Sequence, residues 1–167
     1  MIRKTRKIRC RRGVSLVGTM VAVTILLIAL IGTSTFRYAA AMDGRKARAH
    51  TTAARVALAL GESWRGIKGD VTLDPTELGS SDMEVSVSSW NGHEKPEDFT
   101  LLGNYVVVLD EDDPDSVNYY ATMSWKDVQP GLRALNVNVA WAQRGRGVDD
   151  TENVDKSFGL TIYTQTY

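Results

Sequence analysis

Cysteine and histidine are scarce in this chain of 167 residues, which holds one cysteine and two histidines. Because Cys10 stands alone, no disulfide can form within the chain, and cysteine usage gives no sign of the redox compartment. Neither His50 nor His93 has a partner at zinc-ligand spacing. The chain also lacks a P-loop, a dinucleotide-binding fingerprint and a nucleophile elbow. We therefore expect a protein that is not an enzyme and that has no catalytic residue, metal ligand or cofactor.

Charge is missing from one long stretch near the N-terminus. No charged residue occurs from Gly13 to Phe36, a run of 24 residues. At about 1.5 Å per residue, a helix of this length covers the ~30 Å hydrocarbon layer of a bilayer. A helix also satisfies its own backbone polar groups, as a chain in lipid must. The sequence predicts a membrane-spanning helix over residues 14–36.

The zero net charge of the chain conceals an uneven distribution. Residues 1–13 hold seven basic and no acidic residues, residues 14–65 carry a net charge of +4, and residues 66–167 carry −11. Basic flanks stay in the cytoplasm, so the N-terminus is predicted to be cytoplasmic. We expect a single-pass protein of the cell inner membrane whose C-terminal head is extracytoplasmic, in the periplasm or at the cell surface.

Three interpretations of the N-terminus compete. A cleaved secretory signal would use Ala39 and Ala41 as its cleavage site, but the apolar segment of such signals is typically about 7–15 residues long. The apolar run here is longer, and Arg37 lies before the site. A plain uncleaved signal anchor is the second interpretation. The third is a short basic leader that is removed while the apolar helix is kept.

The residues from Arg11 to Val17, followed at once by the apolar run, carry a family resemblance. They resemble the N-terminus of the type IV prepilin-like family, which includes pilins and type II secretion pseudopilins. The resemblance implies that a prepilin peptidase cuts between Gly13 and Val14 and methylates Val14. It also implies a pilin-like α+β fold, with other pilin or pseudopilin subunits and inner membrane lipid as partners. The apolar run itself is similar to the minor-pilin branch.

Gly18 departs from the family pattern. The family usually carries glutamate at the fifth position of the mature chain, where the carboxylate pairs with the N-terminal amine of a neighbouring subunit. Gly18 cannot form this pair, and loss of the acid in the family accompanies subunits placed at a tip. The resemblance therefore implies a minor or tip-located subunit of a pilus or a secretion pseudopilus, and it weakens the expectation that Val14 is methylated.

Assembly would be carried by the apolar helix, which would pack against the helices of sister subunits. The residues expected to form these contacts are Val14, Leu16, Val17, Gly18, Met20, Val21, Val23, Ile25, Leu26, Leu27 and Leu30. The alternative is a single-span, signal-anchored extracytoplasmic domain that binds a ligand or surface and does not assemble.

The stem after the apolar run has the period of an amphipathic helix. Apolar residues recur at three- and four-residue steps on one face, and they are Ala49, Ala53, Val56, Leu60, Trp64 and Ile67. One helix from Val14 to Arg65 is predicted, with its amphipathic half over 37–66, a stop at Gly66 or Gly69, and a bend or local unwinding over Gly32–Thr35. We interpret the basic residues of the stem as a solvated face and expect no nucleic acid partner.

Residues 67–167 change to a period of two, which is typical of strands with one buried face. Five strands are predicted, and they include Met83–Val87, Leu101–Leu109, Val117–Trp125, Leu135–Trp141 and Phe158–Ile162. Their short connections predict an antiparallel sheet. The apolar face of the stem, Trp64 included, is expected to supply the other side of the core.

Two acidic loops were tested as calcium sites. The first, Asp110–Asp115, fails as an EF-hand because its sixth residue is Asp115 and its twelfth is Ala121. The second contains Asp149, Asp150, Glu152 and Asp155. Acidic loop tips usually solvate the edge of a sheet, so we expect neither loop to hold calcium.

Millimolar calcium is expected to leave the melting temperature of the protein unchanged, because acidic loop tips usually solvate the edge of a sheet and the Asp110–Asp115 loop lacks the EF-hand pattern. Calorimetry with and without calcium, with magnesium as the control, measures this. A rise in melting temperature specific to calcium would contradict the prediction.

Overall fold

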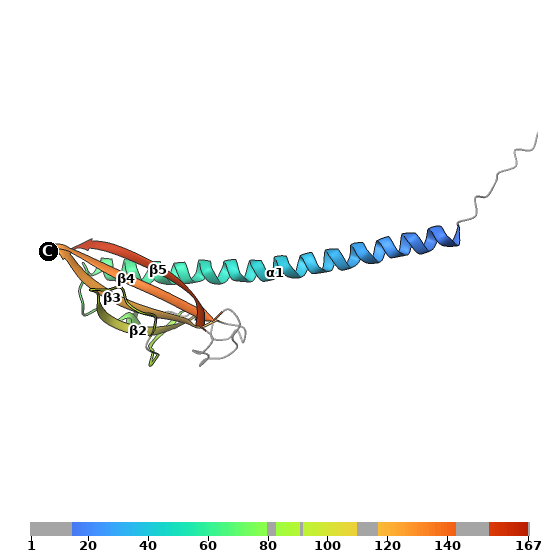
Figure 1. Cartoon of the computed structure of the whole chain (residues 1–167). Coiled ribbons are helices and arrows are strands. Elements are labelled where there is room, and N and C mark those ends of the chain that lie inside the picture. Colours follow the sequence, from blue (N-terminus) through green and yellow to red (C-terminus); the bar gives the residue numbers. More distant parts are fainter. Residues whose placement is uncertain (1–14, 80–82, 91, 110–116, 143–153, 167) are drawn as a thin grey trace, which may run out of the picture. The chain divides into compact units, whose positions relative to one another are not determined.

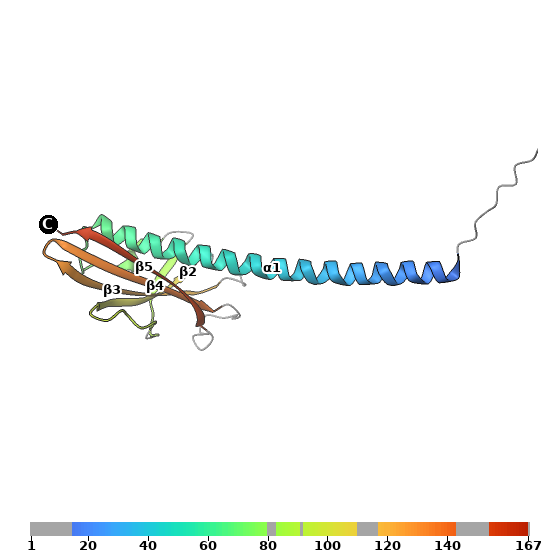
Figure 2. The same ribbon diagram turned by 45° about the horizontal axis from the view of Figure 1, so that its top comes forward.

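The computed structural model describes residues 15–79, 83–90, 92–109, 117–142 and 154–166. Its elements, shown in Figures 1 and 2, are α1 (Leu16–Gly66), η1 (Pro75–Leu78), β1 (Glu84–Val87), β2 (Thr100–Val108), β3 (Tyr119–Gln129), β4 (Leu132–Ala142) and β5 (Val154–Gln165). The predicted α+β class, with an apolar N-terminal helix and an antiparallel sheet, is confirmed. Contacts divide the chain into two compact units, Met1–Gly44 and Arg45–Tyr167.

Helix α1 is uninterrupted from Leu16 to Gly66. Its sequence is rich in alanine and leucine and contains no proline, and both features favour a helix. The local unwinding predicted over Gly32–Thr35 is wrong. Thr33 and Thr35 donate their hydroxyl hydrogens to backbone carbonyls four residues earlier, at 2.7 and 3.0 Å, so these polar side chains are satisfied without opening the helix.

The helix ends where the sequence predicts, through a left-handed turn. Lys68 and Gly69 have φ angles of 59° and 75°, and the Gly69 amide donates to the Trp64 carbonyl at 3.0 Å. A β-carbon at Gly69 would come to 2.6 Å from Thr164 Cγ2 and 3.1 Å from the Trp64 ring. Glycine is needed here both for its backbone angle and for the close approach to β5.

The five strands form one sheet in the order β1-β2-β3-β4-β5, and every neighbouring pair is antiparallel. The predicted number and direction of the strands are confirmed. Strands β3 and β4 are longer than predicted and meet at a tight hairpin around Pro130 and Gly131, where Gly131 has a φ of 80°. The 3-10 turn η1 lies between α1 and β1. Its Asp74 caps it by accepting hydrogen bonds from Thr76.

The core lies between the amphipathic half of α1 and one face of the sheet. The predicted helix face is confirmed except for Ile67, which follows the end of α1 and is 42% exposed. The buried helix residues are Ala53, Val56, Ala57, Leu60 and Trp64, and they join a cluster of sheet residues that includes Val85, Val107, Met123, Leu135, Val137, Val139 and Trp141. A β-carbon at Gly61 would overlap the side chain of Ile162, so glycine lets α1 approach β5 closely.

Two leucines of α1 test this placement. Leu60 is 1% exposed and Leu58 is 51% exposed, so Leu60→Ala removes core packing whereas Leu58→Ala does not. We expect Leu60→Ala to lower the free energy of unfolding of the head by about 2–5 kcal/mol and Leu58→Ala by under about 0.5 kcal/mol. Urea unfolding of both variants, followed by tryptophan fluorescence, measures the difference. Equal losses of unfolding free energy in the two variants would contradict the orientation of α1, in which Leu60 faces the sheet and Leu58 faces solvent.

Candidate functional site

The most unusual surface of the protein is the first half of α1. Every side chain from Leu16 to Phe36 is exposed, in the part of the chain that the structure describes. The large apolar residues in this half are Leu16, Val17, Met20, Val21, Val23, Ile25, Leu26, Leu27, Ile28, Leu30, Ile31 and Phe36. Removing one such side chain from water contributes roughly 1.5–3 kcal/mol, so exposing the whole set to water costs on the order of 20 kcal/mol. A surface of this size needs an apolar environment.

Polar side chains inside this half are already satisfied by the helix itself. Thr19 donates to the Leu16 carbonyl at 2.7 Å, and Thr24 donates to the Met20 carbonyl at 2.9 Å. The same pattern holds at Thr33 and Thr35. These hydroxyls therefore add little cost in an apolar environment. The predictions from sequence did not use these threonines. Their hydroxyl groups can donate to the preceding helical turn, so they were a usable sign that the helix continues.

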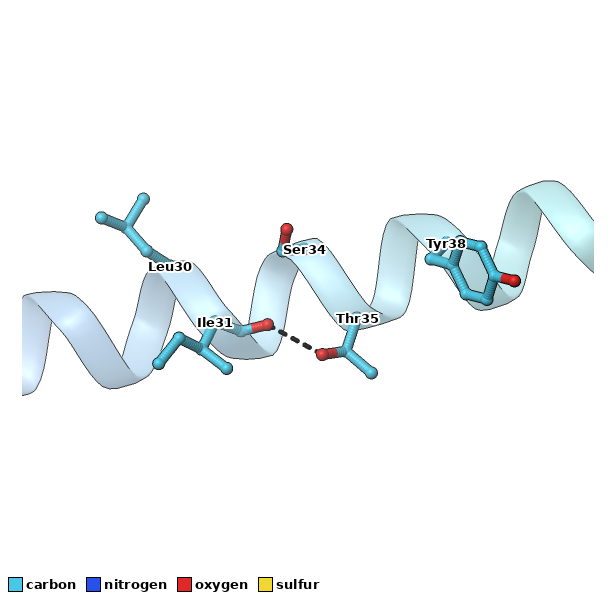
Figure 3. Close-up of a pocket in the computed structure, with 5 residues that line it drawn as sticks. All are labelled: Leu30, Ile31, Ser34, Thr35 and Tyr38. Carbon is cyan, nitrogen blue, oxygen red and sulfur yellow. Dashed lines mark hydrogen bonds between the residues drawn. The ribbon is translucent and has the colours of Figure 1, made fainter.

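A shallow hollow on α1 lies among Leu30, Ile31, Ser34, Thr35 and Tyr38 (Figure 3). All five residues come from the same helix, and the Thr35 hydroxyl turns back to the Ile31 carbonyl at 3.0 Å. No other described element closes the hollow, and it has no ionisable group other than the phenol of Tyr38. We interpret it as a groove on the helix surface, of the kind that a neighbouring side chain fills.

The predicted assembly residues from Leu16 to Leu30 lie on this helix, whereas Val14 and the predicted cleavage residue Gly13 do not fall within the described chain. Leu16, Met20 and Val21 are 77%, 65% and 53% exposed. A β-carbon at Gly18 would meet only Ser15, at 4.0 Å, so no contact within the described chain requires glycine there. Gly13 and Val14 lie outside the described residues.

Histidines and acids of the head do not form a metal centre among the described residues. The His50 ring packs edge-on against Trp141 and Phe158, with centroid distances of 5.9 and 5.4 Å. His93 lies against Trp90 at 6.3 Å. The Asp110–Asp115 loop and most of the second acidic loop lie outside the described residues.

A row of buried neutral oxygens crosses the sheet face that is turned away from α1. Asn104, Thr122 and Asn138 are register partners on β2, β3 and β4, and Ser124 lies two residues along β3. One side-chain oxygen of each is buried and has no hydrogen-bond partner among the described residues. Ser and Thr hydroxyls need a base to act as nucleophiles, and no described histidine or carboxylate is hydrogen-bonded to this row.

Four groups of the head have shifted pKa values. The backbone amide of Thr72 donates to Asp70 at 3.0 Å and lowers the pKa of that carboxyl, and a hydrogen bond from the Thr76 side chain lowers the pKa of Asp74. Burial raises the pKa of the Tyr105 and Tyr119 phenols. The two carboxylates therefore stay ionised to a lower pH than usual, and the two phenols stay neutral to a higher pH.

No protein family model, no curated protein and no solved structure matches this chain. Helix α1 is long and apolar enough to cross a membrane, and it lies near the N-terminus. The head offers no described cluster of catalytic groups, so the apolar half of α1 is the candidate functional site.

Charges placed inside the apolar half test its need for an apolar environment. We expect the full chain to stay in the membrane fraction after alkaline extraction and Leu26→Arg with Leu30→Arg to be largely released, because each arginine costs roughly 2.5–3.5 kcal/mol of insertion free energy near the helix centre. Immunoblots of pellet and supernatant measure this. Leu58→Arg, on the exposed surface of the head, is the matched control and should remain in the pellet.

Proposed function

We propose that this protein is a pilin-like structural subunit of a type IV pilus or a type II secretion pseudopilus, of the minor or tip-located kind. The observation that carries the proposal is that the two halves of α1 differ in their surroundings. Its first half exposes an uncharged and mostly apolar surface, and its second half forms one side of the head core. One helix therefore links a membrane-compatible segment to a folded extracytoplasmic domain.

Retention of the apolar half is supported by its length. The charge-free run from Gly13 to Phe36 has 24 residues, whereas the apolar segment of a cleaved secretory signal is typically about 7–15 residues long. Removal of the basic leader alone, after Gly13, leaves the apolar half attached to its head.

Assembly in this proposal exchanges lipid contacts for protein contacts. Lipid tails are as apolar as leucine side chains, so helix association in a membrane depends on close packing and not on the hydrophobic effect. Gly18 and Gly32 have open space around them, and a second helix can approach closely at both positions. Since Gly18 has no carboxylate, packing rather than an ion pair would hold this position.

The location follows from the charge at each end of the apolar half. Seven basic residues in 1–13 keep the N-terminus in the cytoplasm, and the head is then extracytoplasmic. The partners are a prepilin peptidase, inner membrane lipid and other pilin or pseudopilin subunits. A signal-anchored binding domain would share this topology but would keep its leader, so cleavage after Gly13 separates the two functions.

Mass spectrometry of the mature N-terminus tests the proposal. When the chain is produced together with a prepilin peptidase, we expect a product that begins at Val14, because the peptidase recognises a short basic leader that ends in glycine. Gly13→Leu should remain uncut, and Gly32→Leu is the matched control and should be cut like the original chain. A product that keeps Met1 beside an active peptidase, or one that begins near Met42, would overturn the proposal.

A further inference from the structure

Neutral polar side chains are buried on the face of the sheet that is turned away from α1. They are Asn104 on β2, Thr122 and Ser124 on β3, and Asn138 on β4, and this set is called the polar row below. Thr122 and Ser124 are 3% and 0% exposed. One oxygen of each side chain in the polar row is buried and has no hydrogen-bond partner among the described residues. A buried hydroxyl or amide without a partner has lost its hydrogen bonds to water, so it destabilises the arrangement that buries it.

Residues 92–99 lead into β2, and their first residue lies directly on the polar row. Gly92 has a φ of 66°, in the left-handed region. A β-carbon at Gly92 would overlap the hydroxyl of Thr122 and would come to 2.7 Å from Asn104 Oδ1. Glycine is therefore needed here for its backbone angle and for its close approach to the row.

The last residues of the same segment reach the sheet further along β3. Asp98 pairs with Lys126 at 3.6 Å, and the Lys126 ammonium lies 5.8 Å from the centre of the Phe99 ring. Thr122, Ser124 and Lys126 alternate with inward-facing residues, so they share one face of β3. Since the segment touches Thr122 at its start and Lys126 at its end, it passes Ser124 between them. Residues 92–99 are called the flap below.

Few contacts hold the flap to the sheet. His93, Glu94, Lys95, Glu97 and Asp98 are all exposed. The Asp98 side chain is 82% exposed in its pair with Lys126, so solvent screens the attraction between them. Within the described chain, the loop hydrogen bond of the flap joins the Phe99 amide to the Pro96 carbonyl at 3.2 Å and so lies inside the flap itself.

Closure of the flap therefore gains little and leaves the polar row without partners. When the flap lifts, water can donate to the oxygens of Asn104, Thr122 and Ser124, and their hydrogen bonds are restored. Segments that bury little apolar surface open at a lower free energy than the domain as a whole. The balance between these effects favours a local opening that leaves the core between the sheet and α1 intact.

We propose that residues 92–99 form a flap that opens while the rest of the head stays folded, and that its opening exposes the polar row as an uncharged hydrogen-bonding face. Full closure depends on the missing side chain of Gly92. The flap belongs to the head, so this inference does not depend on the proposed function, which concerns the apolar half of α1.

Thiol labelling of the full-length chain in detergent micelles tests the flap. In a Cys10→Ser background, Ser124→Cys places a thiol beneath the flap, and Met123→Cys is the matched control on the inner face of the same strand; both positions are 0% exposed. We expect the Ser124→Cys thiol to react with an aromatic disulfide reagent about tenfold faster or more than the Met123→Cys thiol, because opening the flap costs less than unfolding the head. Its rate should change little at low urea concentrations, since a local opening exposes little surface.

Equal labelling rates with equal urea dependence would overturn the flap, and would indicate that ordered water satisfies the polar row beneath a closed segment. If Ser124→Cys fails to fold, Thr122→Cys supplies a thiol in the same row, and its rate is compared with the same control.

Gly92→Ala tests the closed position of the flap. Because the added β-carbon would overlap the Thr122 hydroxyl, the flap should no longer close fully, and labelling of the Ser124→Cys thiol should become about tenfold faster or more. Gly79→Ala is the matched control, since a β-carbon there meets nothing closer than 3.6 Å, and it should leave the rate unchanged. A labelling rate that Gly92→Ala does not raise would also overturn the proposal.

Discussion

Packing of one helical stripe against one face of a five-stranded sheet holds the head together. Val56, Leu60 and Trp64 insert their side chains toward the central strands, where Val107, Met123 and Val137 are fully buried. At roughly 1.5–3 kcal/mol for each buried side chain, the three helix residues contribute on the order of 5–9 kcal/mol. That is comparable with the whole net stability of a small domain. Without the helix, the apolar face of the sheet would have no cover.

The same helix therefore has to suit two environments. Its second half needs a water-facing side and a sheet-facing side, whereas its first half is apolar all round. The absence of proline and the carbonyl-bonded threonines let one unbroken helix serve both. The proposed function depends on a helix that suits both environments, because its apolar half can exchange lipid for neighbouring helices while the head stays folded.

Charge is arranged along the chain in a way that the fold alone does not require. The core is neutral, and the charged residues named above lie on surfaces. Yet basic residues collect on the stem and acidic residues on the head. The packing of the core does not depend on this separation, because the buried core residues are uncharged.

Much of this architecture could be predicted from local residue spacing. The period of 3.6 in the stem and the period of two in the head predicted the buried helix face and all five strands, because each period places its apolar residues on a single side. The same periods predicted that Leu60 and Val137 face inward, and both are buried. The error at Ile67 arose because a period does not show where a helix ends. The unwinding predicted at Gly32 does not occur, because the hydroxyls of Thr33 and Thr35 donate to carbonyls of the helix itself.

The sequence by itself determined the apolar half of α1, the amphipathic half, the alternation of the strands and the separation of charge, since these depend on residues close together in the chain. Only the tertiary structure decided the register of the sheet, the approach of Gly61 to Ile162, the packing of His50 between Trp141 and Phe158, and the side of the stem on which Arg48 and Arg55 remain exposed. These features join residues up to about a hundred positions apart. Their contacts are selected by how whole surfaces fit together, which no local pattern records.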